Sequence, residues 1–307
     1  MAVDLVIIGL RFAQYVGAMI LFGSSLFLVF GGLIAPETPA PTLSRMHRLL
    51  SAAAYLALAT APLQFLVQTA SLAGSWPAAL ELGTLKAALV QMSFGKSAAT
   101  RTGLALGAVI LLRTRPPGRA TWRIVAWLGA FIGASLAFSG HGAASEGTTG
   151  LLHLFADVVH ILAAAAWIGA LIIFWWATGS NALPGVTPER LSSSLTAFSG
   201  IGSLIVALIL ATGIINSMFL VGWDIRHVIT SLYGQVLLAK LALFAVMLAL
   251  AAANRFRFAP ALARNLSATS AAHVEGLRRN LALETMAGFL LLAAVAWLGT
   301  LPPIVGP

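Results

Sequence analysis

The sequence has 307 residues, of which 59% are hydrophobic and only 9% are charged. Soluble domains carry about a quarter charged residues, so this composition excludes a soluble globular protein and predicts one that lies in a lipid bilayer. The net charge of +9 could indicate a nucleic-acid partner. We expect no such partner, because the basic residues gather in a few short loops, which is typical of membrane topology. The absence of cysteine excludes disulfides and thiolate metal ligands.

Apolar runs long enough to cross a membrane recur along the whole chain. A membrane helix needs about 20 mostly apolar residues, and eight such runs are present. The third contains Lys96 and Arg101 in its first half, and the segment 77–94 before it could form a short interfacial or re-entrant helix. We predict an all-α integral membrane protein with eight transmembrane helices, at 5–34, 49–73, 95–112, 122–138, 152–177, 195–220, 231–253 and 280–300.

Two arginine-rich loops set the expected orientation. Basic residues concentrate in the cytoplasmic loops of membrane proteins. If the spans alternate, the loop 139–151, which has no Lys or Arg, and both chain termini then face the periplasm. The start of the chain has an acidic residue and no basic region, so the first run is expected to be a retained helix and not a cleaved signal. The cytoplasmic arginines are Arg113, Arg115, Arg119 and Arg123 in one loop and Arg255, Arg257, Arg264, Arg278 and Arg279 in the other.

The two halves of the chain resemble each other. SFGKSAATRTGL at 93–104 and LYGQVLLAKLAL at 232–243 each begin with an aromatic–glycine pair, and a cation follows six residues after each glycine. Four spans in each half would give two copies with the same orientation in the membrane. We predict two parallel four-helix repeats, residues 1–138 and 139–307. A shift of 146 residues then places Arg11, Gln14 and Gly23 onto Asp157, His160 and Gly169.

Three ionisable residues lie on one face of the fifth predicted span. His153, Asp157 and His160 are four and three residues apart, which stacks them along one side of a helix. His141 lies just across the short periplasmic loop. Ionisable groups are costly in a membrane and usually mark a pathway or a ligand site. We predict a metal site formed by His141, His153 and His160. Asp157 is expected not to bind the metal but to fix the tautomer of a ligand histidine by a hydrogen bond.

Arg11 is the expected partner of Asp157, because the repeat places both residues at a similar depth. A plainer interpretation stays open, in which His153 is an interfacial residue and the Arg11–Asp157 pair only joins two helices. Lys240 is a second candidate partner for Asp157. The remaining polar residues inside the spans, expected to line a path or to clamp helices together, are Gln14, Asn216, Lys240 and Glu284.

The ligand types favour copper as the bound metal. Imidazole and thioether groups bind copper in either oxidation state, and three of the six histidines gather at the start of one span. Met19 and Met218 could add thioether ligands, although scattered methionines more often serve packing. We therefore expect a copper ion at this site.

Several motifs of the second half resemble those of the copper-resistance D family (CopD) of bacterial inner-membrane proteins. They are SGH at 139–141, ADVVHILAAAAWIG at 156–169, LYG at 232–234 with Lys240, ANRFRFAP at 253–260, Glu284, and LPP at 301–303. The first half matches only through its general layout of spans. The resemblance implies copper handling at the inner membrane, including copper uptake from the periplasm alongside a small periplasmic copper carrier.

Two other functional classes remain as alternatives. The sequence has no Walker A, dinucleotide-binding or HExxH motif, so we do not expect an enzyme. A b-type haem or quinol redox protein would use His160 as one axial ligand, but it needs a second histidine that faces the first at the same depth. The other alternative is a membrane scaffold for the periplasmic copper carrier.

Overall fold

The computed structural model describes residues 2–139, 147–179, 183–222, 225–264 and 271–304, and every regular element in these ranges is a helix. The first span begins as α1, continues through a π-helical turn, η1, and ends as α2. Short helices precede α6, as the sequence predicted for the segment 77–94. The elements of the first half are α1 (Ala2–Met19), η1 (Ile20–Ser24), α2 (Ser25–Phe30), α3 (Ala40–Ala73), α4 (Trp76–Ala79), α5 (Leu82–Gln91), α6 (Ser93–Thr114) and α7 (Arg119–Ala137).

The described part of the second half consists of four long helices and two short ones. Side-chain caps define two of the helix starts, since Thr187 accepts from the Arg190 N–H and Ser231 accepts from the Gly234 N–H. The elements are α8 (Gly147–Ala177), α9 (Pro188–Leu220), α10 (Ile225–Thr230), α11 (Leu232–Ala253), the π-turn η3 (Asn254–Phe258), α12 (Ala259–Arg264) and α13 (Ala271–Leu298).

Seven helical stretches are long and apolar enough to cross a membrane, so the chain is an all-helical, multi-pass membrane protein. Helix α6 is not among them, because Lys96, Arg101 and Arg113 lower its hydropathy. It nevertheless packs against α3 and α7. The seven stretches are Asp4–Phe30, Ala40–Ala73, Arg119–Ala137, Thr148–Ala177, Pro188–Leu220, Leu232–Arg264 and Val274–Leu298.

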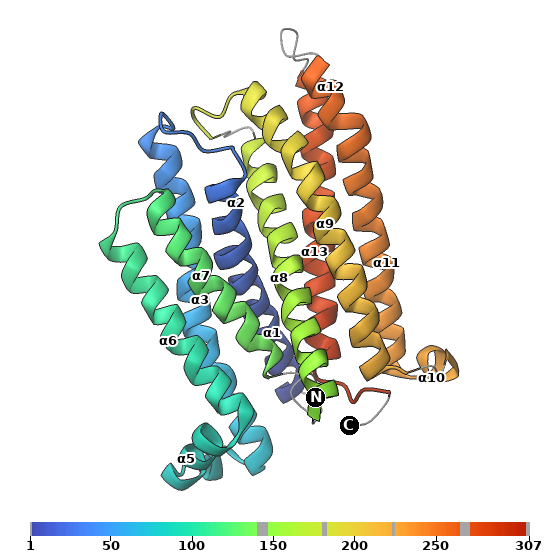
Figure 1. Ribbon diagram of the computed structural model, residues 1–307. Coiled ribbons are helices and arrows are strands. Elements are labelled where there is room, and N and C mark those ends of the chain that lie inside the picture. The colour runs from blue at the N-terminus through green and yellow to red at the C-terminus, as the bar shows by residue number, and fades with distance from the viewer. Residues whose placement is uncertain (1, 140–146, 180–182, 223–224, 265–270, 305–307) are drawn as a thin grey trace.

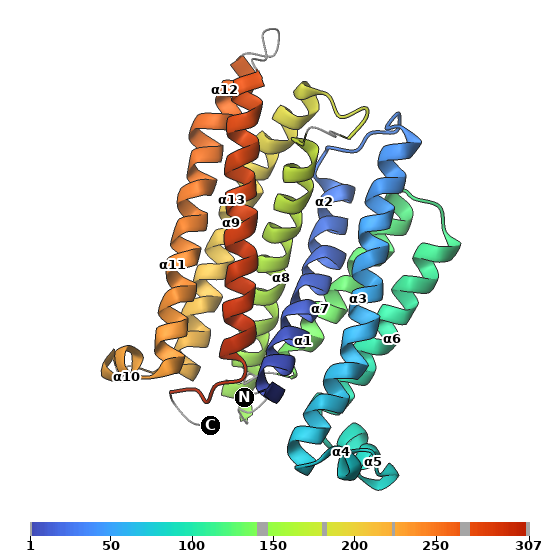
Figure 2. The ribbon, with the colours of Figure 1, turned by 180° about the vertical axis from the view of Figure 1, so that it is seen from behind.

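The long helices run side by side in one bundle (Figure 1). Helices α3, α6 and α7 form one side of it, α9 and α11 form the other, and α1 and α8 lie between them, as the view from behind also shows (Figure 2). Helix α1 begins and α13 ends at the lower end of Figure 1, where α5 and α10 also lie. The α6–α7 connection and α12 lie at the opposite end, so the arginine-rich segments are gathered at one end of the bundle.

The first span and α8 cross at two glycines in the middle of the bundle. A Cβ atom on Gly23 would lie 1.7 Å from the Ala165 carbonyl oxygen, and one on Gly169 would lie 2.2 Å from the Gly23 carbonyl carbon. Ser24 Oγ also donates a hydrogen bond to the Gly169 carbonyl oxygen at 3.0 Å. The two backbones are therefore in direct contact, which only small residues allow between membrane helices.

The close contact at this crossing predicts that one added methyl group strongly lowers the stability of the protein. Gly169→Ala should lower the thermal unfolding midpoint of the purified protein, because the methyl group has room only if the helices separate. Gly9→Ala is the matched control, since nothing lies within 4 Å of a Cβ atom at that position. Alanine there should leave the midpoint unchanged or raise it slightly, because alanine favours a helix over glycine. Equal midpoints for the two variants would show that the helices are not close-packed at Gly169.

Candidate functional site

A cavity of about 470 Å³ lies between α8, α9 and α11 and extends to Val228 of the short helix α10. It therefore lies toward the end of the bundle where α1 begins and α13 ends (Figure 1). Its walls are mostly apolar, and the few polar side chains among them include His160 and Lys240. The thioether side chains of Met218 and Met247 line the same cavity. We call this space the outer cavity.

The hydrogen bonds around His160 leave one ring nitrogen available. Its Nδ1 lies 3.0 Å from Thr212 Oγ1, and the Thr212 hydroxyl donates its own proton to the Leu208 carbonyl oxygen at 2.6 Å. Thr212 must then accept from His160, which assigns the imidazole proton to Nδ1. The lone pair on Nε2 is free to bind a metal ion, and the Nδ1–H bond to Thr212 holds the ring in one orientation.

Asp157 interacts with residues of three helices besides its own. It accepts a hydrogen bond from Asn216 Nδ2 of α9 at 3.3 Å, and the charges of Lys240 and, to a smaller extent, Arg11 act on it. Neither cation forms a salt bridge with Asp157 within the described part of the chain. Arg11 instead donates to the Tyr15 hydroxyl at 3.3 Å. The predicted direct pair between Arg11 and Asp157 therefore does not form, and Lys240 is the stronger charged neighbour.

Of the predicted histidine ligands, only His160 lines the outer cavity in the ranges that the structure describes. His153 is buried, with 2% of its surface exposed, and its ring stacks on Phe219 with the centroids 4.5 Å apart. His141 lies outside the described residues. Among the described residues, no three His, Cys, Asp or Glu side chains come together closely enough to hold a metal ion. The three-histidine site stays a prediction.

The residues around His160 include some that the sequence predicted and some that it did not. Met218, considered there as a thioether ligand, lines the cavity with His160, whereas Met19 is buried in the helix core with 2% of its surface exposed. Met247 was missed because a methionine inside an apolar span resembles ordinary packing. Thr212 was missed because it lies 52 residues from His160, so no local spacing could connect them.

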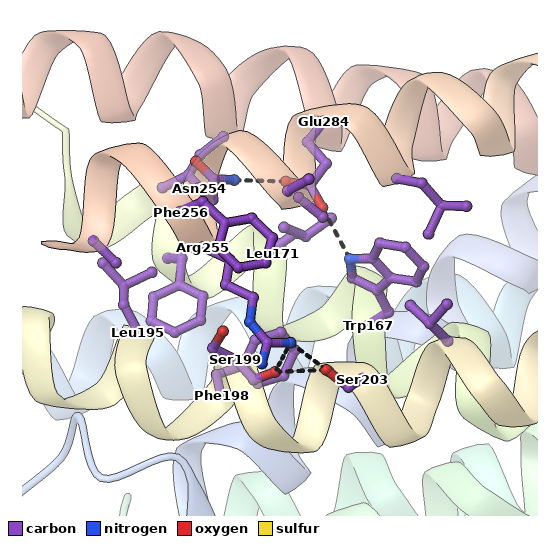
Figure 3. A pocket seen from close by; sticks show the side chains of 18 residues that line it. Trp167, Leu171, Leu195, Phe198, Ser199, Ser203, Asn254, Arg255, Phe256 and Glu284 are labelled. Carbon is purple, nitrogen blue, oxygen red and sulfur yellow. Dashed lines mark hydrogen bonds between the residues drawn. The ribbon is translucent and has the colours of Figure 1, made fainter.

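A second cavity, of about 300 Å³, surrounds a buried carboxyl group (Figure 3). Glu284 of α13, with 1% of its surface exposed, accepts hydrogen bonds from Trp167 Nε1 at 2.9 Å and from Asn254 Nδ2 at 2.7 Å. Asn280 Nδ2 donates to Asn254 Oδ1 at 2.8 Å and so fixes that amide. Arg255 also lines the cavity, but its guanidinium donates to groups of α9. Glu284 is thus held by neutral donors in what we call the inner cavity.

Trp167 stands between the two cavities. Its side chain lines both of them, and its ring packs edge-on against Phe244 with the centroids 6.0 Å apart. The hydrogen bond from its indole N–H to Glu284 fixes the orientation of the ring. One aromatic side chain therefore separates a cavity that contains His160 from a cavity that contains Glu284.

Gln14, which the predicted repeat aligns with His160, does not line the outer cavity. It is buried, with 3% of its surface exposed, and donates to the Thr60 carbonyl oxygen of α3 at 3.0 Å. Gln14, Arg11 and Arg101 line a separate small cavity in the N-terminal half. Of the polar residues predicted inside the spans, Gln14 therefore lines a cavity of the N-terminal half, and Lys240 and Glu284 line two different cavities of the second half.

Comparison with known proteins places the chain in a family. Residues 1–151 match the family described as Copper resistance protein D-like, N-terminal domain, and residues 192–298 match Copper resistance protein D. Copper resistance protein D of Pseudomonas syringae pv. tomato is 34% identical to the chain over 302 residues, which are 96% of each protein. The chain belongs to the copper resistance protein D family.

Two further proteins similar to the chain have names other than copper resistance protein D. Inner membrane protein YebZ of Escherichia coli (strain K12) is 28% identical over 96% of this chain and 98% of that protein. Copper transport protein CutJ of Bacillus subtilis (strain 168) is 31% identical over 78% of this chain and 43% of that protein. No solved structure matches the chain. The match of residues 1–151 also shows that the family resemblance reaches beyond the second half, to which the motifs had confined it.

The hydrogen bonds of Glu284 predict different effects of two substitutions. Glu284→Leu should lower the thermal unfolding midpoint, because it leaves the buried donors of Trp167 and Asn254 unpaired, each at a cost of about 1–3 kcal/mol. Glu284→Gln keeps an acceptor oxygen for one of them and should lower the midpoint less. The comparison is made by thermal unfolding in detergent. A leucine variant as stable as wild type would contradict the network.

Proposed function

We propose that this copper resistance protein D family member binds copper ions at the periplasmic end of its bundle and moves them across the bacterial inner membrane. The observation that carries the proposal is the free Nε2 of His160 in a cavity that two thioethers also line. Imidazole and thioether groups suit copper better than the hard cations calcium and magnesium, which take oxygen ligands. The family membership and the name of the Bacillus subtilis relative support copper as the transported ion.

The proposed orientation places the outer cavity at the periplasm. The arginine-rich end of the bundle then faces the cytoplasm, and both termini are periplasmic. This orientation requires α6 to cross the membrane as an eighth span, with its cations at the ends or inside the bundle. The name of the Escherichia coli relative supports the inner membrane as the location.

The copper site is expected to include His160 with Met218 and Met247, and His141 or His153 as additional histidine ligands. Asp157 would adjust the charge of the site through Asn216 and Lys240 without binding the ion itself. Lys240 repels a cation, so its charge favours a site on the imidazole side of the cavity.

The inner cavity would receive the ion after it has passed Trp167. Glu284, buried and bonded only to neutral donors, offers a carboxylate to a cation on that side. Passage requires the Trp167 ring to move, since it separates the two cavities. Without a nucleotide-binding motif, transport would depend on ion gradients or on exchange with a partner, and a small periplasmic copper carrier is the partner that the resemblance implies.

The redox alternative has less support from the positions of the histidines. A b-type haem needs two axial histidines on facing helices. His47 belongs to the part of α3 near its start, and α3 begins at the opposite end of the bundle (Figure 1). Its Nε2 lies 2.6 Å from the Leu112 carbonyl oxygen. His153 lies on the same helix as His160 and stacks on Phe219. We therefore do not propose catalysis or electron transfer.

Copper binding tests the proposed site. His160→Ala should remove copper from the purified protein while its unfolding midpoint stays close to that of wild type, as measured by elemental analysis after dialysis against copper. His273→Ala, near the start of α13 at the opposite end, is the control and should leave the stoichiometry unchanged. Copper affinity should weaken at acidic pH, because imidazole must be deprotonated to bind a metal. Unchanged copper content in His160→Ala, or a haem Soret band in wild type, would overturn the proposal.

The orientation has its own test, made simple by the absence of native cysteine. A cysteine at Thr148, at the start of α8, should react in spheroplasts with a thiol reagent that cannot cross the membrane. A cysteine at Pro116, between α6 and α7, should react only after the membrane is permeabilised. The reverse labelling pattern would place the outer cavity in the cytoplasm.

A further inference from the structure

A small cavity in the N-terminal half is lined by two arginines and two glutamines. Its lining comes from α1, α3, α6 and α7, together with Ser139, which follows α7. The volume is about 10 Å³, which leaves room for a single small molecule or ion. The side chains around it are Arg11, Gln14, Tyr15, Gln64, Arg101, Leu136 and Ser139.

Several polar atoms of this cavity lack hydrogen-bond partners. The Nε and Nη1 of Arg101, the Nε of Arg11, and one amide oxygen each of Gln14 and Gln64 are buried without a partner. Arg101 is nearly enclosed, with 3% of its surface exposed, and only its Nη2 is bonded, to Ser139 Oγ at 2.9 Å. Buried polar groups in folded proteins are almost always paired, so these atoms indicate a missing occupant.

The charges show what kind of occupant is required. No Asp or Glu lines this cavity among the described residues. The titratable side chains that act on Arg101 are the phenol of Tyr15 and a second cation, Arg11. Asp157 acts on Arg11 from the other half of the bundle, which leaves Arg101 without an acidic neighbour in the part of the chain that the structure describes. A buried charge without a counter-charge is strongly unfavourable in a membrane protein.

A single water molecule would not meet this requirement. It could accept from the guanidinium N–H groups and donate to the glutamine oxygens, but it would leave the charge of Arg101 uncompensated. An anion accepts the same N–H groups and neutralises the charge. The Gln64 amide can turn to present its NH₂ group to such an anion, because its oxygen has no partner to lose.

We propose that the cavity formed by Arg11, Gln64 and Arg101 binds one small monovalent anion of halide size. The size of the cavity excludes a phosphate or a lipid headgroup, which need more space and more donors. In the predicted repeat, Arg11 and Arg101 align with Asp157 and Lys240, so a second cation of the N-terminal half stands at the position of the acid in the other half. The proposal does not depend on copper binding.

The direct test is the thermal unfolding midpoint of the full chain in chloride and in gluconate at equal ionic strength. Chloride should raise the midpoint of wild type in a saturable manner, as a ligand that binds only the folded state does. Bromide should act like chloride, and sulfate should act like gluconate. A midpoint that is the same in all four salts would mean that water or nothing occupies the cavity, and would overturn the proposal.

Two variants separate anion binding from general stability. Gln64→Glu places a carboxylate in the cavity, so its midpoint in gluconate should rise toward that of wild type in chloride, and its response to chloride should disappear. Gln68→Glu, one turn along α3 and outside the lining, is the control and should keep the chloride response. A lower midpoint for Gln64→Glu in gluconate, with the chloride response intact, would overturn the proposal.

Removal of the enclosed cation gives a third readout. Arg101→Gln should lose at least tenfold in apparent chloride affinity, while Arg113→Gln, exposed at the other end of the same helix, should keep the wild-type value. If Arg101→Gln does not fold, the Gln64→Glu pair of variants still decides the question. Equal affinities for wild type and Arg101→Gln would place the chloride effect elsewhere in the protein.

Discussion

The backbone contact between Gly23 and Gly169 is the constraint on which the rest of the bundle depends. It joins the first span to α8 at a distance that no larger residue permits. Gly129 of α7 approaches the same π-helical turn, since a Cβ atom there would lie 2.5 Å from the Phe22 nitrogen. Helix α8 is thereby held in the centre. One side of it meets the N-terminal helices, and His160 and Trp167 line cavities shared with α9, α11 and α13.

Two further glycines hold the short helices at the proposed periplasmic end. Gly95, after Phe94, lies against the Ala88 carbonyl oxygen of α5, and Gly234, after Tyr233, lies against the Val228 carbonyl oxygen of α10; a Cβ atom would lie 2.1 Å and 2.0 Å away, respectively. In each half, the glycine of the aromatic–glycine motif thus allows a short helix to pack closely against the long helix that follows it. Each motif belongs to a helix that carries a cation, Arg101 in one half and Lys240 in the other, and the parallel repeat itself stays a prediction. The halves then differ in charge: one contains two arginines, and the other contains an acid, an imidazole and a lysine.

The sequence predicted the helical membrane fold because hydropathy and loop charge depend only on composition along the chain. The special positions of Asp157, His160, Lys240 and Glu284 were also recognisable, since polar residues are rare in membrane spans. Their partners were not. Asn216 binds Asp157 from 59 residues away, and Trp167 binds Glu284 from 117 residues away, so local spacing carries no signal for either contact. The expected Arg11–Asp157 pair was wrong because two residues at equal depth in two helices need not have side chains that meet.

The central claim is that copper crosses the membrane through the second half of the chain, from the His160 cavity past Trp167 to the Glu284 cavity. The most direct measurement is copper entry into proteoliposomes that contain the purified protein and a trapped copper-sensitive dye. The account predicts time-dependent entry that is lost in protein whose His160 is replaced. Entry no faster than in vesicles without protein, under an imposed gradient and with copper bound to the protein, would contradict transport.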